Sequence, residues 1–140
     1  MFVKIIENTE ELDKAFAIRV KVFVEEQKVS AEVELDEYEP ICKHVLVFDE
    51  EIAVATGRMR IVGDRAKLER ICVLPQYRKC GAGRLIVDKL EELAMTEGYF
   101  KLKLHGQIHA QNFYMSLGYE AASEVFMEEG IAHRLFLKQI

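Results

Sequence analysis

Between residues 65 and 105 the sequence predicts, in order, a strand, a stop at a proline, a glycine-rich turn, a helix and a second strand. This order of elements restricts the possible folds more than any other feature of the sequence. Residues 65–74 have the pattern of a strand, which Pro75 ends because proline has no N–H for a sheet and keeps the preceding residue extended. Residues 83–96 carry apolar side chains at helical spacing, and residues 99–105 have a strand pattern again. A crossover of this kind is expected to be right-handed and to join parallel strands.

The other segments predict antiparallel strands and two further helices. Strand patterns cover Phe2–Glu7, Lys43–Asp49, Ile52–Val62 and two runs that flank Glu129-Gly130. Helices are expected from Asn8, where Glu11 completes a capping box, and over Ile108–Ser116. The first helix is expected to present one face made of Leu12, Ala15, Phe16, Arg19 and Phe23. The acidic stretch Glu25–Glu39 is predicted to be irregular.

These elements together predict an α/β fold. We expect a mixed sheet of about six to seven strands, mostly antiparallel around a central parallel strand–helix–strand unit, with helices on both faces. The chain has 140 residues, two prolines and no internal repeat, so one domain is expected over residues 1–140.

Composition excludes several classes of partner. Half of the residues are hydrophobic and 31% are charged, a balance typical of water-soluble proteins, and no apolar run is long enough for a bilayer. No targeting segment is recognisable at the N-terminus, so no membrane partner and a cytoplasmic location are expected. The formal charge of −5 would repel a phosphate backbone, which argues against a nucleic-acid partner.

The cysteines Cys42, Cys72 and Cys80 are odd in number and lack CxxC spacing. They are expected to be reduced thiols, and neither a disulfide framework nor a metal site is predicted. Cys72 and Cys80 also lack an obvious His or Asp partner, so we do not expect a covalent enzyme intermediate.

The turn that precedes the central helix has the chemistry of an anion site. Gly81 and Gly83 remove side chains where backbone N–H groups must approach a ligand closely, and a helix start adds partial positive charge. Arg78, Lys79 and Arg84 add full charges, so a pyrophosphate would be held here. The alternative is an ordinary turn with solvated basic side chains. The segment is neither a Walker P-loop nor a GxGxxG fingerprint.

Arg78-Lys79-Cys80-Gly81-Ala82-Gly83 resembles the acetyl-CoA pyrophosphate loop of the GCN5-related N-acetyltransferase (GNAT) superfamily, Arg/Gln-x-x-Gly-x-Gly/Ala. Tyr114-Met115-Ser116-Leu117-Gly118-Tyr119, one helix and one strand later, resembles its second signature, Tyr-x-x-x-Gly-Phe/Tyr. The resemblance implies a GNAT-like fold and acetyl-CoA as co-substrate, without a metal. It implies cofactor contacts at Ile71, Cys72, Val73, Arg78, Lys79, Cys80, Gly81, Ala82, Gly83, Arg84, Asn112 and Tyr114.

Within this superfamily, nearly the whole chain is similar to the small ElaA/YjcF-like branch. The similar segments are Arg19, Val22–Gln27, Glu34–Asp36, His44, Gly106–His109 and Phe126–His133. Polar residues that interrupt apolar runs are better explained by a cleft than by a core. The resemblance implies acceptor contacts at Glu25, Gln27, His44 and His133, although Glu25 alone is equally typical of a solvated face and His44 of a strand histidine with a satisfied hydrogen bond.

The resemblance places Tyr114 beside the CoA sulfur, where a phenol that is protonated at pH 7 can donate to the departing thiolate. Alternatively, Tyr114 is a core aromatic residue. The superfamily usually has an Asn seven residues before this tyrosine, where this chain has Gln107, and Asn112 is the candidate substitute for its cofactor contact.

Glu69 is the candidate general base, because it lies in the strand just before the cofactor loop and the acceptor amine must lose a proton before it attacks. The alternative is a salt bridge from Glu69 to Arg58 or Arg70. The backbone N–H of Val73 would stabilise the anionic carbonyl oxygen of the tetrahedral intermediate.

Three functional hypotheses follow. The favoured one is an enzyme that transfers an acetyl group from acetyl-CoA to a primary amine by direct attack in a ternary complex, with a cationic small-molecule or peptide acceptor. The second is a catalytically silent CoA-binding sensor or interaction module. The third is a phosphate- or nucleotide-binding protein, against which the missing P-loop lysine and the missing ribose-binding acid count. The chain is expected to be a monomer or a homodimer.

Overall fold

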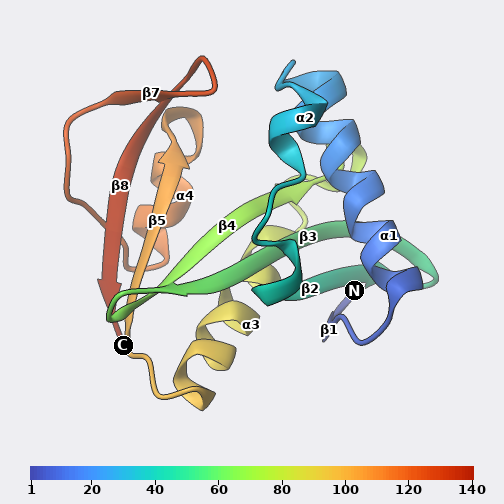
Figure 1. Ribbon diagram of the computed structural model, residues 1–140, viewed down its shortest axis with the longest axis horizontal. Helices are drawn as coiled ribbons and strands as arrows, with labels where there is room; N and C mark the ends of the chain where they lie inside the picture. Colours follow the sequence, from blue (N-terminus) through green and yellow to red (C-terminus); the bar gives the residue numbers. More distant parts are fainter.

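The computed structural model describes residues 1–140, and its eight strands form one mixed sheet (Figure 1). In sheet order the strands are β1 (Phe2–Ile5), β2 (Lys43–Asp49), β3 (Ile52–Val62), β4 (Arg65–Val73), β5 (Lys101–Gln107), β8 (Ile131–Gln139) and β6 (Glu120–Ala121), and β7 (Phe126–Glu128) also pairs with β8. Every pair is antiparallel except β4 and β5, which are parallel. The predicted fold class is confirmed, and the sheet exceeds the expected strand number because two-residue β6 has no sequence pattern.

The helices are short apart from the two that flank the central sheet. They are α1 (Thr9–Arg19), the π-helical segment η1 (Val20–Glu26), α2 (Ala31–Glu34), α3 (Ala82–Thr96) and α4 (Gln111–Ser116), with 3₁₀ turns at η2 (Glu39–Ile41), η3 (Pro75–Tyr77) and η4 (Ile108–Ala110). No helix combines the length and apolar character needed to cross a membrane.

Both faces of the central sheet are covered by helices, α3 on one and α1 on the other (Figure 1). Alternate side chains of β2 point to opposite faces of the sheet. Val45 and Val47 join the core under α3, whereas Leu46 and Phe48 join the core under α1. A strand buried on both faces has a continuous apolar run instead of an alternating one, which matches the sequence of β2.

A β-bulge opens the sheet in its middle. Arg70 has a φ of 56°, and the register between β3 and β4 shifts between Thr56 and Arg58, so β4 contains an extra residue at this point. The parallel pairing of β4 with β5 covers only Ala66 to Leu68, and beyond it the two strands separate into a V (Figure 1). The open end of this V is where the candidate site lies.

The first helix does not end as one regular α-helix. Asn8 caps it as predicted, because its side chain accepts a 2.8 Å hydrogen bond from the Glu11 N–H. From Val20 the helix widens to π geometry, and the Gln27 N–H donates to the Val22 carbonyl five residues back. Of the face expected for this helix, Ala15 and Arg19 are buried and the other three residues are partly buried, and Val22, which was not expected there, is buried as well.

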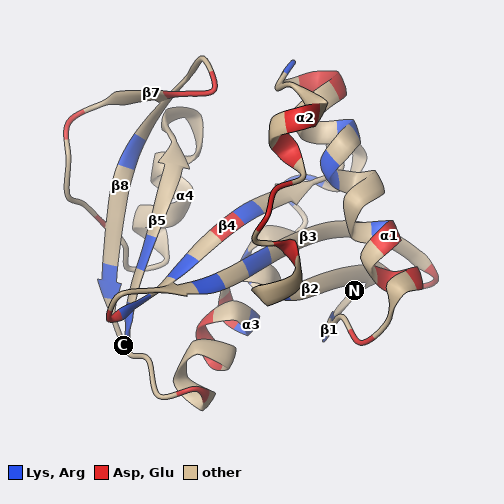
Figure 2. Cartoon of the chain, viewed as in Figure 1, with Lys and Arg blue, Asp and Glu red and all other residues tan.

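The acidic stretch that was predicted to be irregular contains α2 and η2, and its acidic segments run beside basic segments of β3 and β4 (Figure 2). Asp36 forms a bidentate pair with Arg58 at 2.7 and 2.9 Å. Glu39 accepts from Arg19 at 2.7 Å and lies 2.8 Å from Arg58. These ion pairs fix the acidic stretch over the sheet, beside the open V.

Candidate active site

A cavity of about 950 Å³ fills the V between β4 and β5. It runs from the N-terminus of α3 to the β7–β8 hairpin, and η1 and α2 border its side. Apolar side chains make up about half of its lining, and charged and polar groups gather at its two ends. A cavity of this shape suits an elongated ligand that carries an anionic group at one end.

One end of the cavity has free backbone donors. Gly81, the N-cap of α3, has a φ of 88° and offers no side-chain hydrogen bond, and Lys79 also has a positive φ, of 62°. The first intrahelical hydrogen bond runs from the Leu85 N–H to the Gly81 carbonyl at 3.2 Å, so the preceding N–H groups of the first turn lack helical acceptors. Arg84 and Lys79 line the cavity beside these donors, which together can bind a diphosphate.

Gly83 is glycine for a packing reason. A Cβ at Gly83 would lie 3.1 Å from the Phe113 ring, whereas a Cβ at Gly81 would meet nothing. Gly81 is therefore glycine because of its positive φ, whereas Gly83 is glycine because it lets α3 approach α4 closely.

The third cation of this loop has a protein partner. The guanidinium of Arg78 donates to both carboxylate oxygens of Glu26 at 2.6 and 2.8 Å, and its Nε donates to the Val73 carbonyl at 3.1 Å. Arg78 thereby connects η1, the end of β4 and the loop before α3. The hydrogen bond that Arg78 donates to Glu26 is the largest cause that raises the pKa of Arg78, so this side chain stays charged.

Val73 turns its backbone N–H into the cavity. It lies opposite Ala55 on β3, but the ladder hydrogen bond comes from the next residue, Leu74, to the Val54 carbonyl at 2.9 Å. Because successive residues of an antiparallel pair point their N–H groups in opposite directions, that of Val73 faces the open V.

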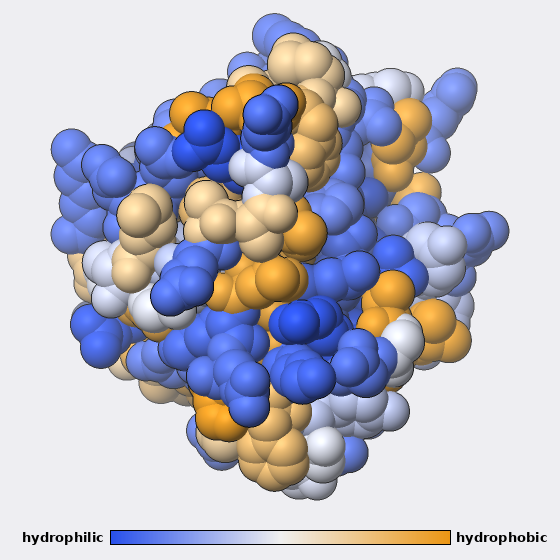
Figure 3. All heavy atoms as spheres, turned by 90° about the vertical axis from the view of Figure 1, so that its left-hand side faces the viewer, coloured by the Kyte–Doolittle hydropathy of each residue, from blue (hydrophilic) through white to orange (hydrophobic).

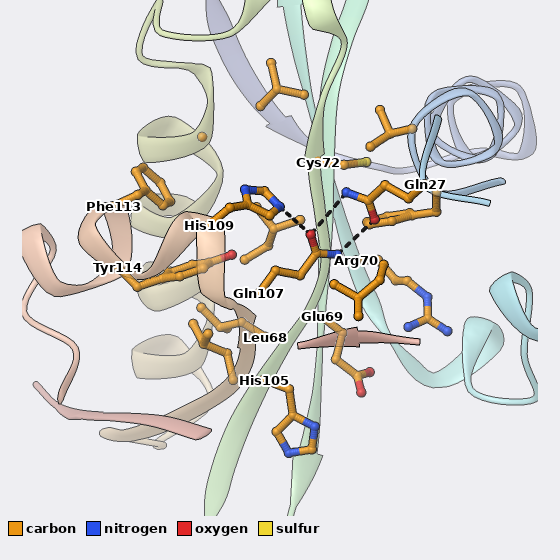
Figure 4. A pocket seen from close by; sticks show the side chains of 18 of the residues that line it. Gln27, Leu68, Glu69, Arg70, Cys72, His105, Gln107, His109, Phe113 and Tyr114 are labelled. Atoms are coloured by element: carbon orange, nitrogen blue, oxygen red, sulfur yellow. Dashed lines mark hydrogen bonds between the residues drawn. The ribbon is translucent and has the colours of Figure 1, made fainter. Parts of the chain in front are cut away.

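A pair of side-chain amides connects the end of η1 with β5 across the cavity (Figure 4). Gln27, which directly follows η1, and Gln107 at the end of β5 exchange two hydrogen bonds of 2.9 and 3.1 Å. The Nε2 atom of His109 lies 2.5 Å from the same Gln107 oxygen. Polar amide groups therefore stand where an amide-containing chain would pass between the strands.

Tyr114 from α4 points its hydroxyl into the V, towards Gln107 (Figure 4). The ring packs against Phe113, Tyr119 and Phe136 with centroid distances of 5.1 to 6.1 Å. The hydroxyl has no hydrogen-bond partner in the chain, and burial raises its pKa, so it remains protonated at neutral pH. The ring of Tyr114 belongs to the core, as the alternative interpretation expected. The role of its hydroxyl beside the CoA sulfur stays a prediction.

Glu69 on β4 lines the other end of the cavity and is surrounded by cations. Its Oε1 lies 2.9 Å from Arg60 and 3.0 Å from Arg58, and its Oε2 lies 3.1 Å from Lys67. Burial by itself would raise the pKa of Glu69, but the hydrogen bond from Arg60 and the charges of Arg58 and Lys67 outweigh it and the pKa is lowered. The salt bridge to Arg58 that was the alternative interpretation is present.

The same end contains a carboxylate between two imidazoles. Glu128 on β7 lies 2.9 Å from Nδ1 of His105 on β5 and 3.7 Å from Nε2 of His133 on β8. The hydrogen bond from His105 lowers the pKa of Glu128, so this carboxylate is ionised at neutral pH. Figure 4 shows Glu69 and His105 extending from their strands towards the same end of the cavity.

The structure brings most of the sequence-predicted site residues together. The residues of that set that line the cavity are Gln27, Glu69, Ile71, Cys72, Val73, Arg78, Lys79, Gly81, Ala82, Gly83, Arg84, Tyr114 and His133. Four lie outside the lining: Glu25, His44, Cys80 and Asn112. His44 instead contacts the Glu39 carbonyl at 3.0 Å and packs edge-on to Phe16.

Sequence reasoning missed several of the contacts that shape the site. The Glu26–Arg78 and Gln27–Gln107 pairs join residues 52 and 80 positions apart, and no local pattern signals such contacts. The pairing of His105 with Glu128 follows from β5 and β7 both flanking β8, which only the topology shows.

Residues 8–136 match the family described as acetyltransferase (GNAT) domain. YjcF of Bacillus subtilis, described as an uncharacterized N-acetyltransferase, is 42% identical over 96% of this chain and 96% of its own length. The crystal structure of Escherichia coli ElaA superposes with a TM-score of 0.84 at 22% identity, over 99% of this chain and 100% of ElaA. That of an aminoglycoside 6′-N-acetyltransferase complexed with coenzyme A has a TM-score of 0.81 at 16% identity, over 99% and 97%.

Proposed function

We propose that this chain, which belongs to the GNAT acetyltransferase family and to its ElaA/YjcF-like branch, transfers an acetyl group from acetyl-CoA to a primary amine by direct attack in a ternary complex. The observation that carries the proposal is the single cavity in the V of the sheet, with helix N–H donors and cations at one end and carboxylates and imidazoles at the other. Tyr114 stands between the two ends (Figure 4).

The cofactor half of the proposal rests on α3 and its loop. The N–H groups after Gly81 would bind the pyrophosphate of acetyl-CoA, with Lys79 and Arg84 as additional cations. The partly buried amides of Gln27 and Gln107 would face the amide-containing arm of the cofactor. The fold neighbour with bound coenzyme A supports acyl-CoA as the co-substrate class.

The chemical step needs an electrophile that is polarised and a leaving group that is stabilised. The N–H of Val73 would donate to the thioester oxygen as it becomes anionic. The Tyr114 hydroxyl would donate a hydrogen bond to the departing sulfur, and its raised pKa keeps the proton available. Cys72 lines the cavity, but burial raises the pKa of its thiol, so the neutral thiol is a poor nucleophile and direct transfer is favoured.

The acceptor half of the cavity favours a cationic amine. Glu128 and Glu129 from the hairpin are partly exposed there, and Glu69 lies across from them on β4. Glu69 as general base remains a proposal, and its three cationic neighbours weaken it because a base with a lowered pKa has little affinity for a proton.

The cellular location, the oligomeric state and the partners of the enzyme are also proposals. Cys42, Cys72 and Cys80 are all free, as in the reducing cytoplasm that we propose as its location. On the face that contains β7 and β8, hydrophilic residues surround small apolar patches, which fits a monomer or a homodimer of one domain (Figure 3). We propose no metal, nucleic acid or membrane partner.

A catalytically silent CoA-binding module is the alternative. Such a module would also use the cofactor half of the cavity, but it would need no hydrogen-bond donor beside the sulfur. The Tyr114 hydroxyl, which has no partner in the chain and keeps its proton, therefore favours an enzyme.

The test is to mix the protein with acetyl-CoA and a panel of primary amines and to follow the release of free CoA thiol. Calorimetric titrations with acetyl-CoA, CoA and ATP accompany it. We expect CoA compounds to bind, ATP to bind much more weakly, and at least one cationic amine to be acetylated. Binding of acetyl-CoA without turnover on any amine would favour the silent module, and preference for ATP would contradict both.

A further inference from the structure

We infer, on the basis of the proposed function, that His105 is the catalytic residue that takes the proton from the acceptor amine and that Glu128 is its positioning residue. His105 lies at the acceptor end of the cavity. On β5 it is on the opposite face of the strand from the buried Leu102 and Leu104. Its side chain is 28% exposed, so a proton can leave it for solvent.

The contacts of His105 fix which nitrogen is available. An ionised carboxylate only accepts hydrogen bonds, so the 2.9 Å contact between Glu128 Oε1 and His105 Nδ1 requires the proton on Nδ1. In a neutral imidazole this leaves a lone pair on Nε2. No residue of the chain makes a hydrogen bond to that Nε2 atom, so it is free to accept a proton from a ligand.

Neighbouring groups hold Glu128 and both rings in place. The Nδ1 of His133 donates to the Ile131 carbonyl at 2.7 Å, and its Nε2 lies 3.7 Å from the second Glu128 oxygen. Phe126 packs edge-on against His105 at 5.2 Å and stacks on His133 at 6.1 Å. A base that is held by packing and by the hydrogen bond of its other ring nitrogen loses little entropy when it acts.

The charges around His105 distinguish it from Glu69. Lys67 and Glu69 face it from β4, Glu128 from β7 and His133 from β8. The carboxylate of Glu69 is neutralised by three cations, whereas Glu128 has only imidazoles within ion-pair distance and accepts the Nδ1 hydrogen bond of His105. Imidazole is also the side chain whose ordinary pKa is nearest to neutral pH, which suits a general base.

The proton balance is complete without a further reactant. The bound ammonium gives one proton to His105 Nε2, and the imidazolium returns it to water. The amine nitrogen then attacks the thioester carbon, a C–N bond forms and the C–S bond breaks. The second proton passes from the attacking nitrogen to the departing thiolate, directly or by way of the Tyr114 hydroxyl. The products are the amide, CoA thiol and one proton.

The experiment compares pH profiles of kcat/KM with an amine that the parent acetylates. We expect His105→Gln to lower kcat/KM at pH 7 by about 10²–10⁴-fold, with the loss shrinking as the pH approaches the pKa of the free amine. Glu128→Gln should give a smaller loss and move the ascending limb of the profile, and acetyl-CoA affinity should be unchanged in both. Glu124→Gln, which removes an exposed carboxylate outside the cavity just before β7, is the matched control.

A ¹⁵N NMR spectrum of the histidine rings gives an independent readout. The parent should show His105 protonated on Nδ1 and unprotonated on Nε2 at high pH, and Glu128→Gln should weaken this preference. If the parent acetylates amines while His105→Gln retains the parental profile, or if Glu69→Gln alone removes the ascending limb, the assignment is wrong and the proposed function stands. If the parent binds acetyl-CoA but acetylates no amine, the proposed function itself fails.

Discussion

At the scale of single residues, Tyr114 separates packing from chemistry. Its ring is held by three aromatic neighbours, whereas its hydroxyl makes no hydrogen bond within the chain. A change that removes only the hydroxyl therefore leaves the core intact, and no buried partner loses its hydrogen bond.

We predict that Tyr114→Phe lowers kcat by about 10²–10⁴-fold and leaves the Kd of acetyl-CoA nearly unchanged, because the hydroxyl acts only as charge develops on sulfur. Single-turnover release of CoA thiol and calorimetric titration measure the two quantities. Parental turnover of the variant would show that Tyr114 is structural and that solvent protonates the thiolate. A joint loss of binding and of melting temperature would show that the ring packing had been disturbed.

Arg78 is a cation that the loop could offer to a pyrophosphate, but its guanidinium is paired with the carboxylate of Glu26. We predict that Glu26→Gln strengthens acetyl-CoA binding up to about fivefold, since an exposed pair contributes about 0.2–1 kcal/mol. Calorimetric Kd values, with Glu32→Gln as an exposed control outside the cavity, would measure the change. Weaker binding of the Glu26 variant would mean that Glu26 orients Arg78 towards the cofactor.

Individual site residues could be predicted from the sequence where a local motif defines them. Gly81, Gly83 and Tyr114 belong to such motifs and line one cavity. His44 does not line it, because His44 lies on β2, away from the V. The salt bridge of Glu69 to Arg58 was the alternative interpretation, and Lys67 lies two residues away on the same face of β4. The contact of Glu69 with Arg60 was beyond prediction, because it depends on the register of β3 against β4.

At the scale of elements, the bulge in β4 makes the site. Arg70 adopts a φ of 56°, a conformation that costs a non-glycine residue about 1 kcal/mol, and the strand turns away from β5 at this point. Its guanidinium also contacts Asp36 at 3.2 Å and Glu34 at 3.4 Å, so the side chain holds α2 and its following loop near the bulge.

A comparison of two variants separates these two roles of Arg70. Arg70→Ala and Arg70→Gly both lose the guanidinium, but only glycine relieves the positive φ. We predict that Arg70→Gly is more stable than Arg70→Ala by about 0.5–1 kcal/mol, measured as the free energy of unfolding in urea. Equal stabilities would indicate that the bulge relaxes to another conformation when the side chain is removed.

Element order was predictable from the sequence because strand and helix periodicities, Pro75 and the glycine turns are local signals. The π geometry of η1 was not, since it depends on the packing of Val22 and on the contacts of Glu26 and Gln27 across the V. The face expected from helical spacing included Phe23, which is partly buried, and not Val22, which is buried, and both line the cavity.

At the scale of the whole molecule, a network of ion pairs fastens the acidic stretch to the sheet. Arg19 and Arg58, both almost fully buried, contact Glu34, Asp36 and Glu39. The sequence predicted only an irregular acidic stretch, because composition cannot show that arginines 15 to 22 positions away lie beneath it. Buried arginines without these partners would be strongly destabilising.

This network predicts that the fold is sensitive to acid. Burial alone raises the pKa values of Asp36 and Glu39, but hydrogen bonds and charges from Arg58 and Arg19 prevail and lower both to about 2. The unfolded chain therefore binds more protons than the folded chain below about pH 5, and the stabilisation present at neutral pH is lost as the pH falls from about 5 to 2. Glu34 opposes this in part, because burial raises its pKa.

We predict a loss of about 2–3 kcal/mol in the free energy of unfolding for each of Asp36 and Glu39 across this window, less for the two together because they share Arg58. Urea unfolding followed by circular dichroism at pH 7, 5, 4 and 3 measures it.

Asp36→Asn should be less stable than the parent at pH 7 and should lose less on acidification, because the titrating group is absent. Asp13→Asn, an exposed change on α1 without an ion pair, should follow the parental curve. If Asp36→Asn and the parent lost stability in parallel down to pH 3, the acid sensitivity would come from other carboxylates, and the pair of Asp36 with Arg58 would contribute little to the fold.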